Sequence, residues 1–165
     1  TDLTWVSGLT SLTTLSVYDD TVTHLDLGHP PNLDTLYLGG KNLADLSTLS
    51  ELNGLTHLRL VTPAATDLAP LSALTDMTDL QISGTRATDL TPIASLGGLA
   101  RLTIWESQLN GLPDLTGMRS LTSLTVTHDQ LSSLTIGTPP SLTTLDASNN
   151  HLTGVALSGL PRSRP

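Results

Sequence analysis

The feature that most constrains this chain is a change of apolar spacing, from every third residue to every second, within one short stretch. Across residues 65–82 an apolar residue stands at every third position from Leu68 to Leu80, and Ile82 follows two positions later. Residues 87–104 repeat the arrangement. Three residues per turn is the period of a 3₁₀ helix, and alternation is the period of a strand. The combination predicts one coil of a solenoid.

The coil recurs along the chain, and we call each repeat a lap. The first leucine of each predicted strand lies 21 or 22 residues after the previous one. These strand leucines are Leu15, Leu36, Leu58, Leu80, Leu102, Leu124 and Leu145. Another apolar residue follows each of them two positions later. Repetition at a fixed period indicates a repeat protein, in which each unit packs on its neighbours.

Each lap approximates the pattern L-x-x-L-x-L-x-x-N-x-L, which resembles the leucine-rich-repeat family over essentially the whole chain. The 22-residue laps with D-L-x-P-L after the turn are similar to the repeats of bacterial internalin-type proteins. The resemblance implies an α/β right-handed solenoid with one short strand per repeat. Its strands would form a concave parallel β-sheet, and its convex side would carry 3₁₀ or irregular segments.

The convex segments differ between laps. Asp45, Asp67 and Asp89 precede segments with leucines at every third position, where a carboxylate oxygen can cap free N–H groups. Residues 25–31 and 134–140 instead combine alternating apolar residues with a Pro-Pro pair. We therefore expect extended convex segments that end in a proline turn in laps one and six.

The asparagine of the family pattern is largely replaced. The family's asparagines hydrogen-bond the backbone of neighbouring turns, but Asn150 is the one Asn at the seven equivalent positions. Lys41 and Pro63 cannot reproduce these hydrogen bonds. We expect looser turns in laps two and three.

The sequence predicts one leucine-rich-repeat domain over residues 1–160, made of half a repeat and seven laps, and a disordered tail over residues 161–165. The chain begins in the middle of a lap, without a visible capping element. We expect it to be part of a longer protein that extends N-terminal to residue 1. An uncapped first strand would also allow edge-to-edge self-association.

Composition argues against several classes of partner. The net charge of −8 and the lack of a Lys or Arg cluster argue against nucleic acid. No apolar run is long enough to span a membrane, and without Cys there is no disulfide or thiolate metal site. No cofactor is expected. The compartment stays undecided, with the cytoplasm slightly favoured over secretion or the cell surface.

Aromatic residues are scarce, and three of the four are predicted to point outward from the sheet. In each lap the residues one before, one after, three after and four after the strand leucine face outward, because strand side chains alternate. We call this surface the sheet face. Tyr18, Tyr37 and Trp105 occupy it. Exposed Trp and Tyr are favoured binding anchors, although packing between neighbouring strands is the alternative.

Equivalent positions of successive laps form rows across the sheet. One row places Asp79 between His57 and Arg101, and another places Glu106 beside His128. A surface charge ladder explains the first row without a ligand. The candidate ligand-binding residues are Tyr18, Tyr37, His57, Arg59, Asp79, Arg101, Trp105, Glu106 and His128.

Small residues on the sheet face predict a trough. Gly39, Gly40, Ser83 and Gly84 would leave a low floor between Tyr18 and Trp105. The two aromatic residues are four strands apart, which corresponds to ~19 Å at the usual strand spacing. A trough of that width suits a peptide, a protein loop or a glycan.

No catalytic motif is present, and the open sheet argues against a closed active site. His24, Asp26 and His29 come closest to a metal cluster, but they lack further ligands and are interpreted as structural or incidental.

The sequence therefore predicts a non-catalytic protein-interaction module. Its expected setting is the C-terminal sensor domain of a larger, bacterial, NLR-like protein, because the repeat pattern breaks at residue 161. A secreted or surface internalin-like adhesin is the alternative. A structural spacer that acts through its edges is the second alternative.

Overall fold

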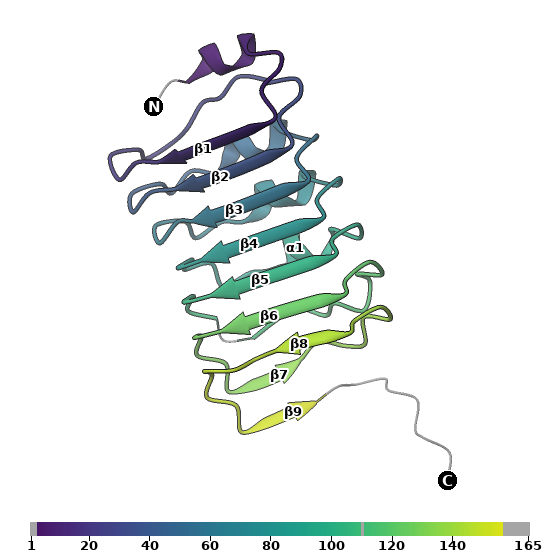
Figure 1. Cartoon of the computed structure of the whole chain (residues 1–165). Coiled ribbons are helices and arrows are strands. Elements are labelled where there is room, and N and C mark those ends of the chain that lie inside the picture. The colour runs from purple at the N-terminus through teal and green to yellow at the C-terminus, as the bar shows by residue number, and fades with distance from the viewer. Residues whose placement is uncertain (1–2, 110, 157–165) are drawn as a thin grey trace.

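Seven parallel strands stack in chain order to form the main sheet of this protein. The computed structural model describes residues 3–109 and 111–156. The strands are β1 (Thr14–Tyr18), β2 (Thr35–Gly39), β3 (His57–Val61), β4 (Asp79–Ser83), β5 (Arg101–Trp105), β6 (Ser123–Thr127) and β8 (Thr144–Asp146). Figure 1 shows them side by side, with the N-terminal helical turn above β1 and the later helical turns behind the sheet. The predicted solenoid with one short strand per lap is confirmed.

The register of the sheet follows the repeat. Leu15 pairs with Leu36, and each strand leucine pairs in the same way with the next one as far as Leu145. The leucines of β2 to β6 are buried, whereas Leu15 and Leu145 are only partly buried. The predicted rows across the sheet are therefore present in the structure.

Short helical turns form the back of laps two to four. They are η2 (Ser47–Glu51), η3 (Ala69–Ala73) and α1 (Thr91–Ala94), and η1 (Thr4–Gly8) belongs to the first half lap. The last of the three is a single α-helical turn where the sequence predicts 3₁₀ or irregular structure. In each turn one buried apolar residue, such as Leu71, faces the sheet.

The aspartates before these turns cap them as predicted. Oδ1 of Asp45 accepts the backbone N–H of Ser47 at 2.9 Å, and Asp67 and Asp89 do the same for the residues two positions on, at 2.8 Å each. These bonds satisfy an N–H group that the first helical turn leaves without an intrahelical partner.

Laps one and six have the extended backs that the sequence predicts. In lap six β7 (Ser133–Thr135) pairs with β9 (Gly154–Ala156) in a second, two-stranded sheet, and in lap one His24 forms an isolated bridge to Asp45. In lap five, residues 111–115 form neither a helix nor a strand. The N–H of Leu115 donates to the carbonyl of Ile136 at 3.0 Å and joins this segment to the back of lap six.

A ladder of threonines joins the laps where the strands begin. The carbonyl of Thr56 accepts the N–H groups of Thr78 and Asp79, at 2.9 and 3.0 Å, and also the hydroxyl of Thr78 at 3.0 Å. Thr122 and Thr143 repeat the hydroxyl bond to the preceding lap, each at 3.0 Å. The ladder stands two residues before the strand leucine, a position outside the family pattern at which five of the seven laps have threonine.

The turns of laps two and three, which were expected to be looser, differ in their hydrogen bonds. In lap two the side chain of Asn42 donates to the carbonyl of Asp20 at 2.6 Å. This hydrogen bond joins two neighbouring turns, as the asparagine of the family pattern does. In lap three the hydroxyl of Thr62 is buried and has no hydrogen-bond partner among the described residues. Looser packing of these turns stays a prediction.

Two further expectations concern the extent of the chain. The predicted tail at residues 161–165 and the domain boundary at residue 160 lie outside the described residues, so the domain division stays a prediction. Within residues 3–109 and 111–156, no helix has the length and apolar character needed to cross a membrane.

We predict that Thr78→Val lowers the free energy of unfolding by about 0.5–1.5 kcal/mol, because it removes one hydroxyl bond of the ladder. Urea denaturation measures the change. Thr88→Val is the control, because Thr88 is exposed and its hydroxyl has no partner among the described residues. Equal losses in both variants would show that the ladder bond contributes nothing beyond the generic effect of the substitution.

Candidate functional site

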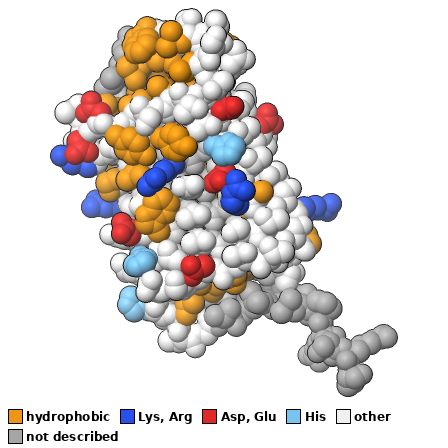
Figure 2. Space-filling model, viewed as in Figure 1, with side chains coloured by type: hydrophobic (Ala, Val, Ile, Leu, Met, Phe, Trp, Pro, Cys, Tyr) orange, Lys and Arg blue, Asp and Glu red, His pale blue; other side chains and the backbone are white. Residues whose placement is uncertain are grey.

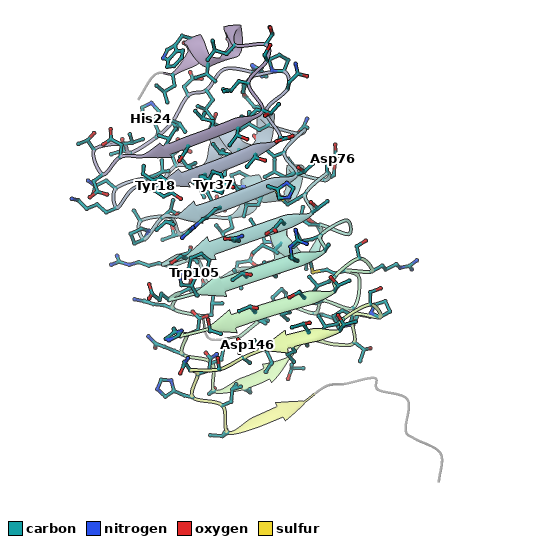
Figure 3. All side chains as sticks on the ribbon, in the orientation of Figure 1. Tyr18, His24, Tyr37, Asp76, Trp105 and Asp146 are labelled. Atoms are coloured by element: carbon teal, nitrogen blue, oxygen red, sulfur yellow. The ribbon has the colours of Figure 1, made fainter. Side chains whose placement is uncertain are left out.

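The three aromatic side chains predicted to face outward do so to different degrees. Tyr18 and Tyr37 are exposed, with 54% and 39% of their surface accessible, whereas Trp105 is half-buried. They project from β1, β2 and β5 on the same face of the sheet (Figure 3). Figure 2 shows apolar side chains gathered over the first strands, and charged side chains along the edge at which the strands end.

Arg59 explains why Trp105 is partly covered. Its guanidinium carbon lies 5.4 Å from the centroid of the Trp105 ring, although the two residues are on β3 and β5. A cation over an indole face is attracted by the negative potential of the ring. Ser83 ends the intervening strand and is buried. This part of the predicted low floor is therefore not open.

The other part of the floor is open and forms a depression of about 560 Å³. It is lined by Tyr18, Asp19, Asp20, Gly39, Gly40, Lys41, Val61 and Pro63. Ser83 and Gly84 are not among these residues. The single trough expected between Tyr18 and Trp105 is thus wrong in extent, because Arg59 crosses the sheet between them.

Two glycines allow the chain to pack closely beneath this depression. A Cβ atom at Gly39 would lie 2.5 Å from Cδ1 of Tyr18, so the tyrosine ring packs closely against this residue. A Cβ atom at Gly40 would collide with the carbonyl oxygen of Asp19. Any larger residue at either position would displace the ring or the backbone.

Carboxylates stand at one end of the depression. Asp20 is paired with Lys41, whose Nζ lies 3.1 Å from Oδ2. Oδ1 of Asp19 accepts the N–H and the hydroxyl of Thr21, at 2.8 and 2.7 Å, and these bonds lower the pKa of the Asp19 carboxyl. Among the described residues, Oδ2 of Asp19 has no hydrogen-bond or ion-pair partner.

The predicted polar row is only partly connected. Nε of Arg101 lies 2.8 Å from Oδ2 of Asp79, whose side chain is 15% exposed. The ring of His57 instead contacts the hydroxyl of Thr56, 2.8 Å from its Nδ1. The row therefore contains one ion pair, between Asp79 and Arg101, as expected of a surface charge ladder. His57 belongs to the row but not to this ion pair.

Glu106 and His128 share an unusual backbone conformation. Their φ angles are +52° and +58°, and Gly84 and Asn149 have positive φ at the equivalent positions of their laps. A residue with a Cβ atom is strained there, whereas glycine is not. The two side chains are adjacent and exposed, but no ion pair joins them within the part of the chain that the structure describes.

A buried carboxylate lies beneath these two turns. Asp129 is 3% exposed, and its Oδ1 accepts the backbone N–H of Ser107 at 2.7 Å. Its Oδ2 is buried and has no hydrogen-bond partner among the described residues. Burial raises the pKa of the Asp129 carboxyl to about 6, and the Ser107 bond and the charge of His128 offset only part of this effect.

Metal-binding chemistry finds little support in the described residues. No group of three or more His, Cys, Asp or Glu side chains among them could hold a metal ion. Of the weak cluster considered in the sequence, His29 lies 3.2 Å from Glu51, and Asp26 accepts the N–H of Gly28 at 3.0 Å.

Sequence reasoning missed the residues that shape the depression at its rim. Asp19, Asp20, Lys41 and Pro63 belong to the turns after the strands, and only the first of them is in a row assigned to the sheet face. Asp129 stands at the asparagine position of the repeat, five residues after Leu124. This position points inward, which is the sequence signal that could have indicated a buried charge.

No protein-family model matches the sequence, and no curated protein matches it. An internalin (inlF) from Listeria monocytogenes superimposes with a TM-score of 0.58 and 22% identity, over 93% of this chain and 60% of that one. Internalin C2 (inlC2) from the same organism gives 0.52 and 22%, over 93% and 84%. A leucine-rich-repeat protein from Leptospira interrogans gives 0.70 and 21%, over 90% and 46%.

We predict that Asp129→Asn stabilises the protein, and that the gain depends on pH. The folded-state pKa of about 6 lies above the usual 3.8, so the folded protein loses stability as the pH rises through this interval. The variant avoids the burial of a charge and retains the acceptor for Ser107. The expected gain is on the order of 1–3 kcal/mol above pH 6.

Urea denaturation of both proteins at about pH 4 and about pH 7.5 measures the gain. Exposed aspartates contribute equally to both proteins and cancel in the difference. The gain should shrink markedly at the lower pH. A gain of the same size at both values would contradict a buried, ionised Asp129.

We also predict that Glu106→Gly stabilises the protein by about 1 kcal/mol, because glycine adopts positive φ without strain. Gln108→Gly is the matched control at an exposed position without positive φ, and should cost about 0.5–1 kcal/mol. Thermal unfolding of both variants measures these opposite signs. Destabilisation by Glu106→Gly would mean that the glutamate side chain makes a stabilising contact that exceeds its backbone strain.

Proposed function

We propose that this chain, which is a leucine-rich-repeat solenoid, is a non-catalytic recognition module that binds a macromolecular partner on its sheet face. One observation carries the proposal. A chain with two Trp, two Tyr and no Phe places Tyr18, Tyr37 and Trp105 on one open surface. Such side chains bury a large apolar area and retain a polar group, which makes them effective anchors in protein interfaces.

The polar residues around the anchors support the same use. Arg59 is held over Trp105, so both side chains are ordered before a partner arrives. Prior ordering lowers the entropic cost of binding. The ion pair of Asp79 and Arg101 lies on the same face, one strand from Arg59, and fits the polar rim of an interface. A protein or peptide therefore suits this surface, with a glycan as the less apolar alternative.

The open form of the surface supports recognition rather than catalysis. The lining residues of the depression beside Tyr18 include no Ser, Thr, Cys or His, and the amine of Lys41 is held in an exposed ion pair with Asp20. The candidate residues His57 and His128 stand exposed on separate laps.

The proposal extends to the kind of protein that contains this module. We place the module in a larger, NLR-like protein as its C-terminal sensor, which would detect a ligand for the rest of that protein. The alternative is a surface adhesin, favoured by the likeness of the fold to two internalins. A structural spacer that associates edge to edge through β1 is the second alternative, because Leu15 and Val17 are only partly buried there.

We predict that the double substitution Tyr37→Ala and Trp105→Ala abolishes capture of the partner. Loss of two anchors should weaken binding by roughly 1,000-fold, because each hot-spot side chain contributes ~2 kcal/mol. Pull-downs from native lysate and from culture medium, followed by titration of the recovered partner, measure the loss. The source of the partner also separates the sensor from the adhesin.

Trp5→Ala is the matched control. Trp5 lies on η1 rather than on the sheet face, and 64% of its surface is exposed. This variant should bind the partner as tightly as the wild type, and all variants should have the same circular dichroism. A partner retained by the double variant would move the binding surface to the convex side or the edges, and salt-insensitive self-association without another partner would favour the spacer.

A further inference from the structure

The depression beside Tyr18 has three kinds of wall. The tyrosine ring forms an aromatic wall, Val61 and Pro63 form an aliphatic one, and Gly39 and Gly40 form the floor. The carboxylates at one end stand beside this apolar channel. The arrangement matches a long side chain that has an apolar stem and a cationic head.

The cations on the sheet face and at the rim of the depression already have partners within the chain. Lys41 lies against Asp20, Arg101 lies against Asp79, and Arg59 lies over Trp105. Asp19, in contrast, keeps one carboxylate oxygen without a partner among the described residues. Its hydrogen bonds to Thr21 lower its pKa, so it stays ionised at neutral pH. The charge left for a ligand in the depression is therefore negative.

We propose that the depression is a subsite for an arginine side chain of the protein partner. The stem lies along Val61 and Pro63, and the guanidinium lies over the exposed side of the Tyr18 ring and donates to the free oxygen of Asp19. A planar guanidinium can stack on an aromatic ring and bond a carboxylate at the same time. The inference deepens the proposed function, because it names a residue that the partner must present.

The negative charge of Asp19 favours an arginine side chain over a neutral sugar. A pyranose could also stack on Tyr18, but a neutral ring gains nothing from an ionised carboxylate beyond its hydrogen bonds. The net charge of −8 adds a long-range attraction for a basic partner. Arginine is therefore the occupant that the observations favour, and a neutral sugar is an outcome for the test to recognise.

A spectroscopic titration tests the subsite without the native partner. The probes are the blocked peptide acetyl-Gly-Arg-Gly-amide, the same peptide with citrulline, and cellotriose. Amide shifts of Gly39 and Gly40 in ¹H–¹⁵N spectra follow binding. The arginine peptide should bind with a dissociation constant in the millimolar range, about five-fold more tightly than the citrulline peptide, and added salt should weaken it.

Four variants of the chain sharpen the assignment. Asp19→Asn keeps the acceptor for Thr21 and should weaken the arginine peptide about five-fold, and Tyr18→Leu should weaken it several-fold. Lys41→Met should tighten binding, because it removes a competing cation and frees Asp20. Asp76→Asn is the control for net charge, since Asp76 is exposed at the opposite edge of the sheet (Figure 3).

Each outcome has a definite meaning. Shifts confined to the depression and lost in the Asp19 variant would support the subsite. Equal binding of the arginine and citrulline peptides, tighter binding of cellotriose, or equal weakening by Asp19→Asn and Asp76→Asn would overturn it. The absence of any shift would also overturn it. The proposed function is tested separately, and it would fail if a partner bound the Tyr37→Ala and Trp105→Ala double variant as tightly as the wild type.

Discussion

The surface of this protein depends on one constraint, the one-to-one parallel pairing of each lap with the next. Strand leucines pair with strand leucines. A shift of the strand register by one residue would therefore expose a column of leucines to the solvent. The threonine ladder fixes the same register where the strands begin, through carbonyls such as that of Thr56, which accepts three donors from the next lap. Residues about 22 positions apart therefore become neighbours on the sheet face.

The turns after the strands divide the sheet face into two regions. From lap four onward the residue four positions after the strand leucine has positive φ, as at Gly84 and Glu106, whereas Asp19 and Gly40 do not. The depression lies in the first region, and the strained turns and buried Asp129 lie in the second. Strained backbone and unpaired buried charge are both costly, and natural proteins tolerate them where surrounding structure or function compensates. Among the described residues, the strained turns and the buried carboxylate are thus both found in the second region.

Periodicity was sufficient to predict the fold and the rows, because a 22-residue repeat determines which residues face inward and which strands are adjacent. It could not predict contacts that depend on side-chain reach. Arg59 extends over two strands to Trp105, and Tyr18 lies down on Gly39, so the expected trough is interrupted. The pKa of Asp129 was also out of reach, because desolvation depends on how tightly adjacent turns close over a carboxylate.

Pairing of the cations within the chain affects how a partner would be selected. Lys41 and Arg101 lie against carboxylates of the same chain, so neither is left to attract an acidic partner. The unpaired charge at the depression belongs to Asp19, at the edge of the aromatic surface rather than at its centre. Charges at a rim mainly accelerate association and reject wrong partners, whereas buried aromatic area slows dissociation. Since exposed charges are screened beyond ~8–10 Å in physiological salt, selection by Asp19 requires a cation placed within contact distance.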